Sequence, residues 1–257
     1  MIRTHLALAA LILGSAPALA APSFIGDYSV SFLGLPIASA SFKSSYEGEV
    51  YTINGSVSSS GLARLFDDTT GTLTARGRFG PEHPMPDSFR ANYTYGSKAS
   101  SIDVRFRDGN VISTKVTPAP KGRGGDWVKL GKADLRMVVD PIAATVIRAE
   151  NLDDVCRRTV KMYDGELRAN LTLSQVSKER MSVTGFDGET VTCRMSFDPV
   201  AGYRKGRKAL EYLKNRAQIN VTFAPLGETG VYAPIYATVG TQIGTITIKA
   251  RRFEATN

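Results

Sequence analysis

Histidine is the side chain that most often serves as a general base near neutral pH, and this chain has two. His5 lies in an N-terminal segment that we expect to be removed, which leaves His83. Because Pro84 and Pro86 follow His83 so closely, we expect it in an exposed turn, a poor place for an oriented base. The chain has no G-x-S-x-G nucleophile sequence either. The sequence therefore predicts no Ser-His-Asp triad.

Residues suited to metal ions and phosphates are equally scarce. One histidine and two cysteines, which we expect to be oxidised, cannot build a zinc site of the usual kind. The acidic pairs Asp67-Asp68 and Asp153-Asp154 keep a two-carboxylate hydrolase open as an alternative, although acids in turns are usually solvated. We expect no catalytic residues, no cofactor and no metal, and so no enzyme.

Cys156 and Cys193 are the cysteines of the chain. Cys193 lies on the apolar face of an alternating stretch, residues 190–197, so its side chain should point into the core. In an oxidising compartment the two thiols would form a structural disulfide. A redox-active pair is the alternative, but such pairs are usually close in sequence, as in C-x-x-C.

Two basic stretches could bind an anion. Arg204, Lys205, Arg207 and Lys208 form the denser one, and a second surrounds Trp127. Positive patches attract nucleic acid or anionic lipid, and nucleic acid is not an expected partner for an exported protein. We therefore expect an anionic lipid or an envelope protein as partner. A solvated basic face that only aids solubility is the alternative.

The first twenty residues have the pattern of a cleavable signal peptide. Arg3 precedes the apolar run of residues 6–13, and Ala18-Leu19-Ala20 matches the small-x-small cleavage rule. The run is much shorter than the roughly 20 residues that span a bilayer. We predict a signal peptide at residues 1–20, a periplasmic location, and a protein that is not integral to the membrane.

The elements that must position these residues are strands. Apolar and polar side chains alternate over residues 27–32, 38–43, 51–57, 89–95 and 102–106, and later over 167–173, 180–186, 190–197, 218–224 and 243–253. Such alternation buries one face and wets the other, as in antiparallel sheets. We predict an all-β, mainly antiparallel fold, either a curved sheet or an open β-barrel with a few short helices, formed by one domain over residues 21–257.

Helix and turn signals are few. Short helices are expected at residues 62–66, at 140–148, where Asp140 and Pro141 form a start signal, and at 207–215. Asp187-Gly188 predicts a tight hairpin turn, and residues 117–125 predict a long loop.

Several motifs together resemble the bacterial DUF3108 family of uncharacterised exported proteins. They are Gly34-Leu35-Pro36-Ile37-Ala38, Asp140-Pro141-Ile142-Ala143-Ala144, Cys156-Arg157-Arg158-Thr159, Tyr163-Asp164-Gly165, Thr192-Cys193, residues 197–203, Ala233-Pro234-Ile235 and Gly244-Thr245-Ile246. The resemblance implies a periplasmic β fold in which the two cysteines occupy paired positions, and it implies no catalytic residues. One departure is Ala38, where the family often has glycine.

These observations leave three hypotheses. The first is a non-enzymatic envelope protein whose curved sheet binds a lipid or another hydrophobic ligand, with the basic patch at its headgroup. The second is a structural or interaction protein that supports envelope integrity without a small ligand. The third, an outer-membrane barrel, is disfavoured by twelve prolines and by the absence of a terminal aromatic residue.

Overall fold

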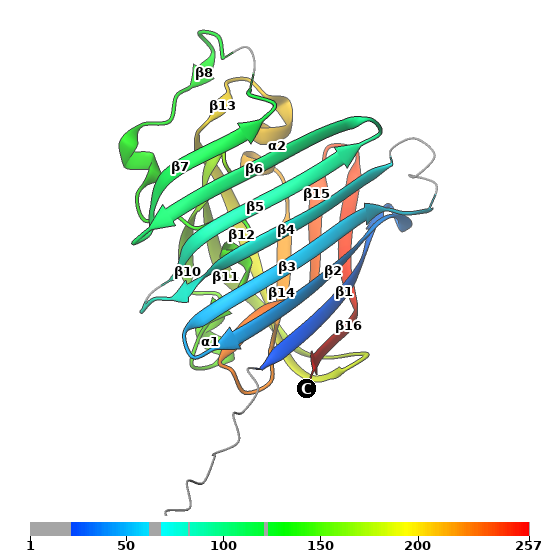
Figure 1. Cartoon of the computed structure of the whole chain (residues 1–257). Helices are drawn as coiled ribbons and strands as arrows, with labels where there is room; N and C mark the ends of the chain where they lie inside the picture. Colours follow the sequence, from blue (N-terminus) through cyan, green and yellow to red (C-terminus); the bar gives the residue numbers. More distant parts are fainter. Residues whose placement is uncertain (1–21, 62–67, 82, 121–122, 257) are drawn as a thin grey trace, which may run out of the picture.

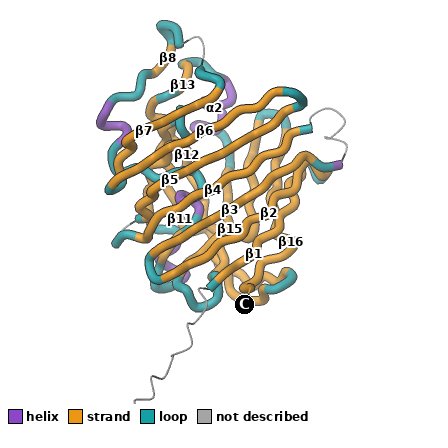
Figure 2. The backbone as a smooth tube through the Cα atoms, in the orientation of Figure 1, coloured by secondary structure: helices purple, strands orange, loops and turns teal. Residues whose placement is uncertain are grey.

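The computed structural model describes residues 22–61, 68–81, 83–120 and 123–256. Strands make up most of them, and the helices are short (Figures 1 and 2). The predicted all-β, mainly antiparallel fold with a few short helices is confirmed. The expected signal peptide and the expected helical turn at residues 62–66 lie outside the described residues.

The N-terminal half forms consecutive strands, each antiparallel to the next. They are β1 (Ser23–Phe32), β2 (Leu35–Glu47), β3 (Val50–Ser59), β4 (Thr69–Phe79), β5 (Pro84–Tyr95), β6 (Lys98–Arg107) and β7 (Asn110–Thr117). Their registers align side chains of one kind into rows. Lys43 pairs with Asn54, which pairs with Thr74, on the outer face, whereas Phe42 and Ile53 belong to the inner face. Period-two alternation thus becomes a curved sheet with a polar outside and an apolar inside.

The C-terminal half continues the same sheet, because β16 pairs with β1. Its strands are β10 (Arg158–Tyr163), β11 (Arg168–Val183), β12 (Phe186–Ala201), β14 (Ile219–Pro225), β15 (Val231–Thr241) and β16 (Gly244–Thr256). The short strand β9 (Ile147–Arg148) pairs with β15, and β8 (Trp127–Val128) pairs with β13 (Tyr203–Arg204) in a separate small ribbon. The helical elements are η2 (Lys132–Leu135), η3 (Ala143–Thr145), α1 (Leu152–Val155) and α2 (Lys208–Asn215).

The sheet curls until its two edge strands, β7 and β10, approach one another. In the described part of the chain no ladder joins these edges, so the sheet is not closed into a barrel. Residues 138 and 139 lie between them instead. The amide of Val138 donates to the carbonyl oxygen of Gly109 beside β7 (2.9 Å), and the amide of Val139 donates to that of Lys161 on β10 (2.8 Å).

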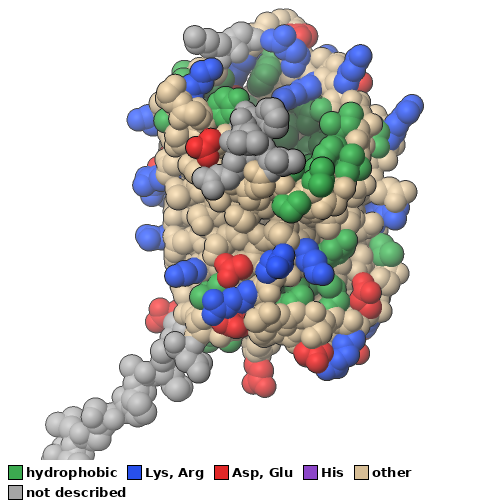
Figure 3. Space-filling view, turned by 90° about the vertical axis from the view of Figure 1, so that its right-hand side faces the viewer, with side chains coloured by type: hydrophobic (Ala, Val, Ile, Leu, Met, Phe, Trp, Pro, Cys, Tyr) green, Lys and Arg blue, Asp and Glu red, His purple; other side chains and the backbone are tan. Residues whose placement is uncertain are grey.

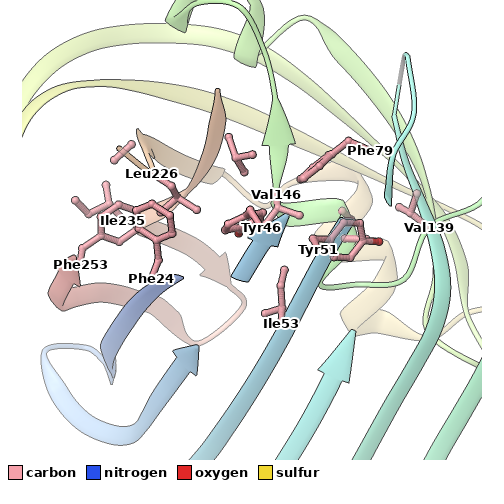
Figure 4. Close-up of a cluster of buried hydrophobic side chains, with 14 of the residues drawn as sticks. Phe24, Tyr46, Tyr51, Ile53, Phe79, Val139, Val146, Leu226, Ile235 and Phe253 are labelled. Atoms are coloured by element: carbon pink, nitrogen blue, oxygen red, sulfur yellow. The ribbon is translucent and has the colours of Figure 1, made fainter. Parts of the chain in front are cut away.

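The concave side of the sheet holds the core (Figure 4). Residues 138–156, here called the inner segment, contribute Val139 and Val146, which pack with strand residues such as Tyr51 and Phe79. Each large side chain buried in this way stabilises the fold by roughly 1.5–3 kcal/mol. The inner segment therefore fills part of the space that the curved sheet encloses.

The expected disulfide is present and ties the inner segment to the sheet. The Sγ atoms of Cys156, next to α1, and Cys193, on β12, are bonded, with the Cα atoms 5.5 Å apart. Both residues are fully buried. The confirmed bridge spans 37 positions of sequence. A loop of that length corresponds to about 4 kcal/mol in the chain-entropy treatment.

The hairpin turn predicted at Asp187-Gly188 is wrong. The turn lies at Thr184 and Gly185, and Asp187 is inside β12, paired with Ser182. Gly185 has a φ of +84°, and a Cβ atom there would lie 2.3 Å from the Cβ of Glu254 on β16. Packing against a distant strand thus decides the turn position, over the local preference of Asp-Gly.

The helix predicted at residues 140–148 is reduced to the single 3₁₀ turn η3. Asp140 does cap this turn, since its Oδ1 accepts from the amides of Ile142 and Ala143, both at 2.9 Å. Val146 is already extended, and β9 begins at Ile147 to pair with β15. Strand pairing therefore ends the helix after one turn. The helix predicted at residues 207–215 is confirmed as α2, and the predicted loop lies between β7 and β8.

Candidate functional site

The candidate site is an apolar cavity of about 290 Å³ on the concave side of the sheet. This volume is close to the lower end of the roughly 300–1,000 Å³ that is usual for small-molecule sites. Its walls are mostly hydrophobic side chains of the strands and of the inner segment: Phe24, Ile25, Tyr28, Val30, Ala40, Phe42, Tyr46, Ile53, Ile142, Val146, Leu226, Ala233, Pro234, Ile248 and Phe253. In Figure 3, hydrophobic side chains surround a hollow near the upper end of one side of the molecule.

Tyr28 and Phe42, on the paired strands β1 and β2, form one wall of the cavity. Their rings meet edge to face, with centroids 5.8 Å apart. The Tyr28 hydroxyl donates to the carbonyl oxygen of Pro234 at 2.8 Å. Burial raises the pKa of Tyr28 far above its usual value, so this hydroxyl stays protonated. The wall therefore presents an apolar ring surface whose polar atom already has a partner.

Another part of the wall belongs to the turn η3. Thr145 lies there, and its hydroxyl donates to the carbonyl oxygen of Ile142 at 2.8 Å. Ile142 and Val146 turn apolar side chains into the cavity. Because the walls are mostly apolar and the hydroxyls of Tyr28 and Thr145 already donate within the protein, the cavity suits a ligand that brings apolar surface and few hydrogen-bonding groups.

Asp140 caps the turn that carries this part of the wall. The carboxyl group is fully buried, and desolvation raises its pKa to about 6, although the two capping amides act in the opposite direction. Among the described residues, its second oxygen, Oδ2, has no hydrogen-bond partner, and neither has the buried hydroxyl of Tyr51. Burial raises the pKa of the Tyr51 hydroxyl, and the nearby Asp140 carboxylate raises it further. Asp140 acts here as a turn cap and not as a group that faces a ligand.

The predicted basic patch lies at one end of the sheet. Arg204 ends β13 and contacts Asp126 (Nε to Oδ2, 3.3 Å), while Arg207 and Lys208 start α2. Arg204, Lys205, Arg207 and Lys208 are all exposed. The structure thus brings the four predicted residues together on the surface, and none of them lines the cavity.

The sequence matches a family model described as "Protein of unknown function (DUF3108)" over residues 27–251. The chain belongs to the DUF3108 family. A crystal structure described as a beta-barrel-like protein of domain of unknown function DUF1849, from Brucella abortus, is similar at 9% sequence identity with a TM-score of 0.49, covering 92% of this chain and 98% of that one. No curated protein matches the sequence.

The other residues singled out in this DUF3108 chain are not assembled into a site. His83 is half-buried and not exposed as predicted, and its Nε2 atom is shielded from solvent without a partner among the described residues. Asp67 lies outside the described residues, and Asp68 is exposed. The carboxylate of Asp153 forms an ion pair with Lys178 (Oδ1 to Nζ, 2.6 Å). Across the described ranges no cluster of three or more His, Cys, Asp or Glu side chains could hold a metal ion.

A larger depression, of about 700 Å³, lies over strands β1 to β5 on the other face of the sheet. Its walls are short polar side chains, for example those of Ser41, Ser56 and Thr72, which are neighbours in the ladder. We prefer the smaller cavity as the candidate site of this DUF3108 member, because it combines concavity with hydrophobic walls.

Sequence reasoning missed the cavity itself. Alternation indicated that Tyr28, Val30 and Phe42 face inward, but it could not show whether their side chains meet or leave a gap. The missing information is the path of the inner segment, which approaches β1 and β2 only through tertiary packing.

Proposed function

We propose that this protein is a non-enzymatic envelope protein that binds a lipid or another hydrophobic molecule inside its curved sheet. The observation that carries the proposal is the cavity of about 290 Å³ with almost entirely apolar walls. Water finds few hydrogen-bond partners in such a space, whereas burying an acyl chain there would contribute about 0.8 kcal/mol of favourable free energy per CH₂ group.

The place of work in this proposal is the periplasm. The signal-peptide pattern of residues 1–20 supports export, and the bond between Cys156 and Cys193 suits an oxidising compartment. In the described part of the chain, no helix has the length and apolar character needed to cross a bilayer. The mature protein would be the single domain of residues 21–257.

A binding role without catalysis is supported by the chemistry of the cavity. Of the four hydroxyl-bearing residues that line it (Tyr28, Ser44, Tyr46 and Thr145), Tyr28 and Thr145 donate to backbone carbonyl oxygens. The buried carboxyl group of Asp140, whose pKa burial raises to about 6, does not line the cavity and caps a turn. The basic patch of Arg204, Lys205, Arg207 and Lys208 would attract the anionic headgroup of a lipid ligand.

Mass spectrometry of organic extracts tests the proposal directly. The protein is purified from its native compartment without detergent, and the extract should contain a lipid in near-stoichiometric amount. Ala40→Trp places an indole in the cavity and should remove most of that lipid, since Ala40 lines the wall. Ser56→Trp adds the same side chain on the outer face and serves as the control.

The proposal fails if the native extract carries no lipid. It fails equally if the folded Ala40→Trp protein retains as much lipid as the Ser56→Trp control. Thermal unfolding of both variants confirms that each is folded before extraction.

A further inference from the structure

Three exposed hydrophobic side chains gather on two neighbouring hairpin turns. Leu33 is 65% exposed, Leu35 is 64% exposed and Ile243 is 79% exposed. Leu33 lies in the β1–β2 turn, Leu35 follows it as the first residue of β2, and Ile243 lies in the β15–β16 turn. Large apolar side chains grouped at the surface in this way mark contact sites more often than scattered single ones do.

Hydrogen bonds and side-chain packing join these turns to the basic patch. The amide of Leu33 donates to the carbonyl oxygen of Thr245 on β16 at 3.1 Å. The Leu33 side chain covers Gly244, since a Cβ atom there would lie 2.6 Å from its Cδ2. On the other side, Nε2 of Gln242 donates to the carbonyl oxygen of Lys208 at 3.4 Å. The two turns and the start of α2 thus form one continuous edge, here called the hairpin edge.

The hairpin edge carries positive charge beside its apolar side chains. Lys205, Arg207 and Lys208 are exposed. Within the described ranges none of these three forms an ion pair with an acid. Exposed apolar side chains next to unpaired cations are the combination with which peripheral proteins bind the interface of anionic membranes.

Leu33 also occupies a conformation that disfavours leucine. Its φ is +50°, and Gly34 follows with a φ of +83°, so the two residues form a tight turn with both φ angles positive. Asparagine, aspartate and glycine are preferred in such a turn, and a bulky side chain is costly. Since Leu33 is mostly exposed, the core gains little from it, which points to a partner outside the protein.

The hairpin edge also adjoins the strands that line the cavity. Val30 on β1 and Ile248 on β16 pair with each other and line the cavity, and the pair Phe32 and Ile246 separates them from the turns. A lipid that leaves a bilayer at the edge would reach the apolar walls after a short path.

We propose that the hairpin edge docks on an anionic lipid bilayer, with Leu33, Leu35 and Ile243 entering the interface and Lys205, Arg207 and Lys208 contacting the headgroups. The inference rests on the proposed function in one respect, because docking there would place the cavity next to its lipid source. A protein partner is the competing explanation of the same side chains.

Co-sedimentation with vesicles tests the proposal. Purified mature protein is mixed with vesicles of phosphatidylethanolamine and phosphatidylglycerol, and with vesicles of phosphatidylcholine alone. It should sediment with the anionic vesicles and much less with the neutral ones. Leu33→Asn combined with Ile243→Asn should weaken binding by about tenfold or more, because two apolar side chains no longer enter the interface.

The charges are tested separately. Lys205→Gln combined with Lys208→Gln should weaken binding by about fivefold per charge removed at low salt, and raised salt should reduce this difference. Val50→Asn is the matched control, since Val50 is 53% exposed but begins β3, next to the β2–β3 turn and far from the hairpin edge along β2. This variant should bind like the unchanged protein.

The proposal is overturned if the unchanged protein ignores anionic vesicles, or if the edge variants and Val50→Asn weaken binding equally. A second outcome is that the unchanged protein binds no vesicles but crosslinks to another protein, and that the variant Leu33→Asn, Ile243→Asn loses this crosslink. That outcome would assign the edge to a protein partner. The Ala40→Trp variant separates the two proposals. If it still binds vesicles while native extracts contain no lipid, docking stands and the ligand proposal fails.

Discussion

The hydroxyl of Tyr28 on β1 donates a hydrogen bond to the carbonyl oxygen of Pro234 on β15, 206 positions later in the sequence, at 2.8 Å. This bond spans β16, which lies between β1 and β15 in the sheet. It is possible only because the sheet is curved enough for side chains on its concave face to reach past a neighbouring strand. The bond is therefore a consequence of the same curvature that creates the cavity.

Tyr28→Phe should lower the free energy of unfolding by about 1 kcal/mol, the usual net contribution of one hydrogen bond. The carbonyl oxygen of Pro234 would lose its donor while the ring contact with Phe42 remains. Urea unfolding measures the change, with Tyr95→Phe as an exposed control. Equal stability of the two variants would show that the bond contributes nothing.

The carboxyl group of Asp140 should make stability depend on pH. Its folded pKa is raised from 3.8 to about 6, so between these values the folded state binds more protons than the unfolded state. The contribution of Asp140 is then fully present below about pH 4 and is lost as pH rises through about 6. A shift of this size corresponds to about 3 kcal/mol.

Asp140→Asn isolates this effect, because the amide oxygen can still cap η3 but the side chain does not titrate. The difference in unfolding free energy between the original protein and the variant should fall as pH rises from about 4 to about 6 and stay flat above that. Urea unfolding at a series of pH values measures it. A constant difference across the series would contradict the raised pKa.

Breaking the Cys156–Cys193 bond should cost about 2–5 kcal/mol of stability, because it closes a long loop and joins the inner segment to β12. Cys156→Ser combined with Cys193→Ser should unfold at lower urea concentration. Addition of a reductant should then shift the midpoint of the original protein but not that of the double variant. A reductant effect on both would point to a cause other than this bridge.

Leu33→Asn should stabilise the fold by about 1 kcal/mol, since asparagine adopts a positive φ more readily than leucine does. For a protein of this size that corresponds to a rise in Tm of about 2–4 °C. Leu35→Asn is the matched control, because Leu35 is equally exposed but lies in strand β2. A lower Tm for Leu33→Asn would show that Leu33 contributes to packing.

Strands with clear alternation were predictable, whereas others were not. Residues 102–106 and 190–197 alternate cleanly and lie in β6 and β12. Strands β4, β10 and β15 were missed, as were the two-residue strands β8, β9 and β13. Strand β4 contains Gly71 and Gly77, which leave gaps in the apolar pattern, and β15 contains Pro234, which usually argues against a strand. Their neighbours in the sheet supply the pairing that their own sequences only weakly favour.

The sequence alone determined the all-β class, the inward direction of Cys193 and the grouping of cations from Arg204 to Lys208, because each depends on near neighbours in the chain. Only the tertiary structure decided the turn at Gly185, the single turn of η3, the half-burial of His83, and the gap between Tyr28, Phe42 and Val146. A cavity is the space left when segments far apart in sequence pack incompletely. No local pattern encodes it, because its shape depends on the register and curvature of all the strands together.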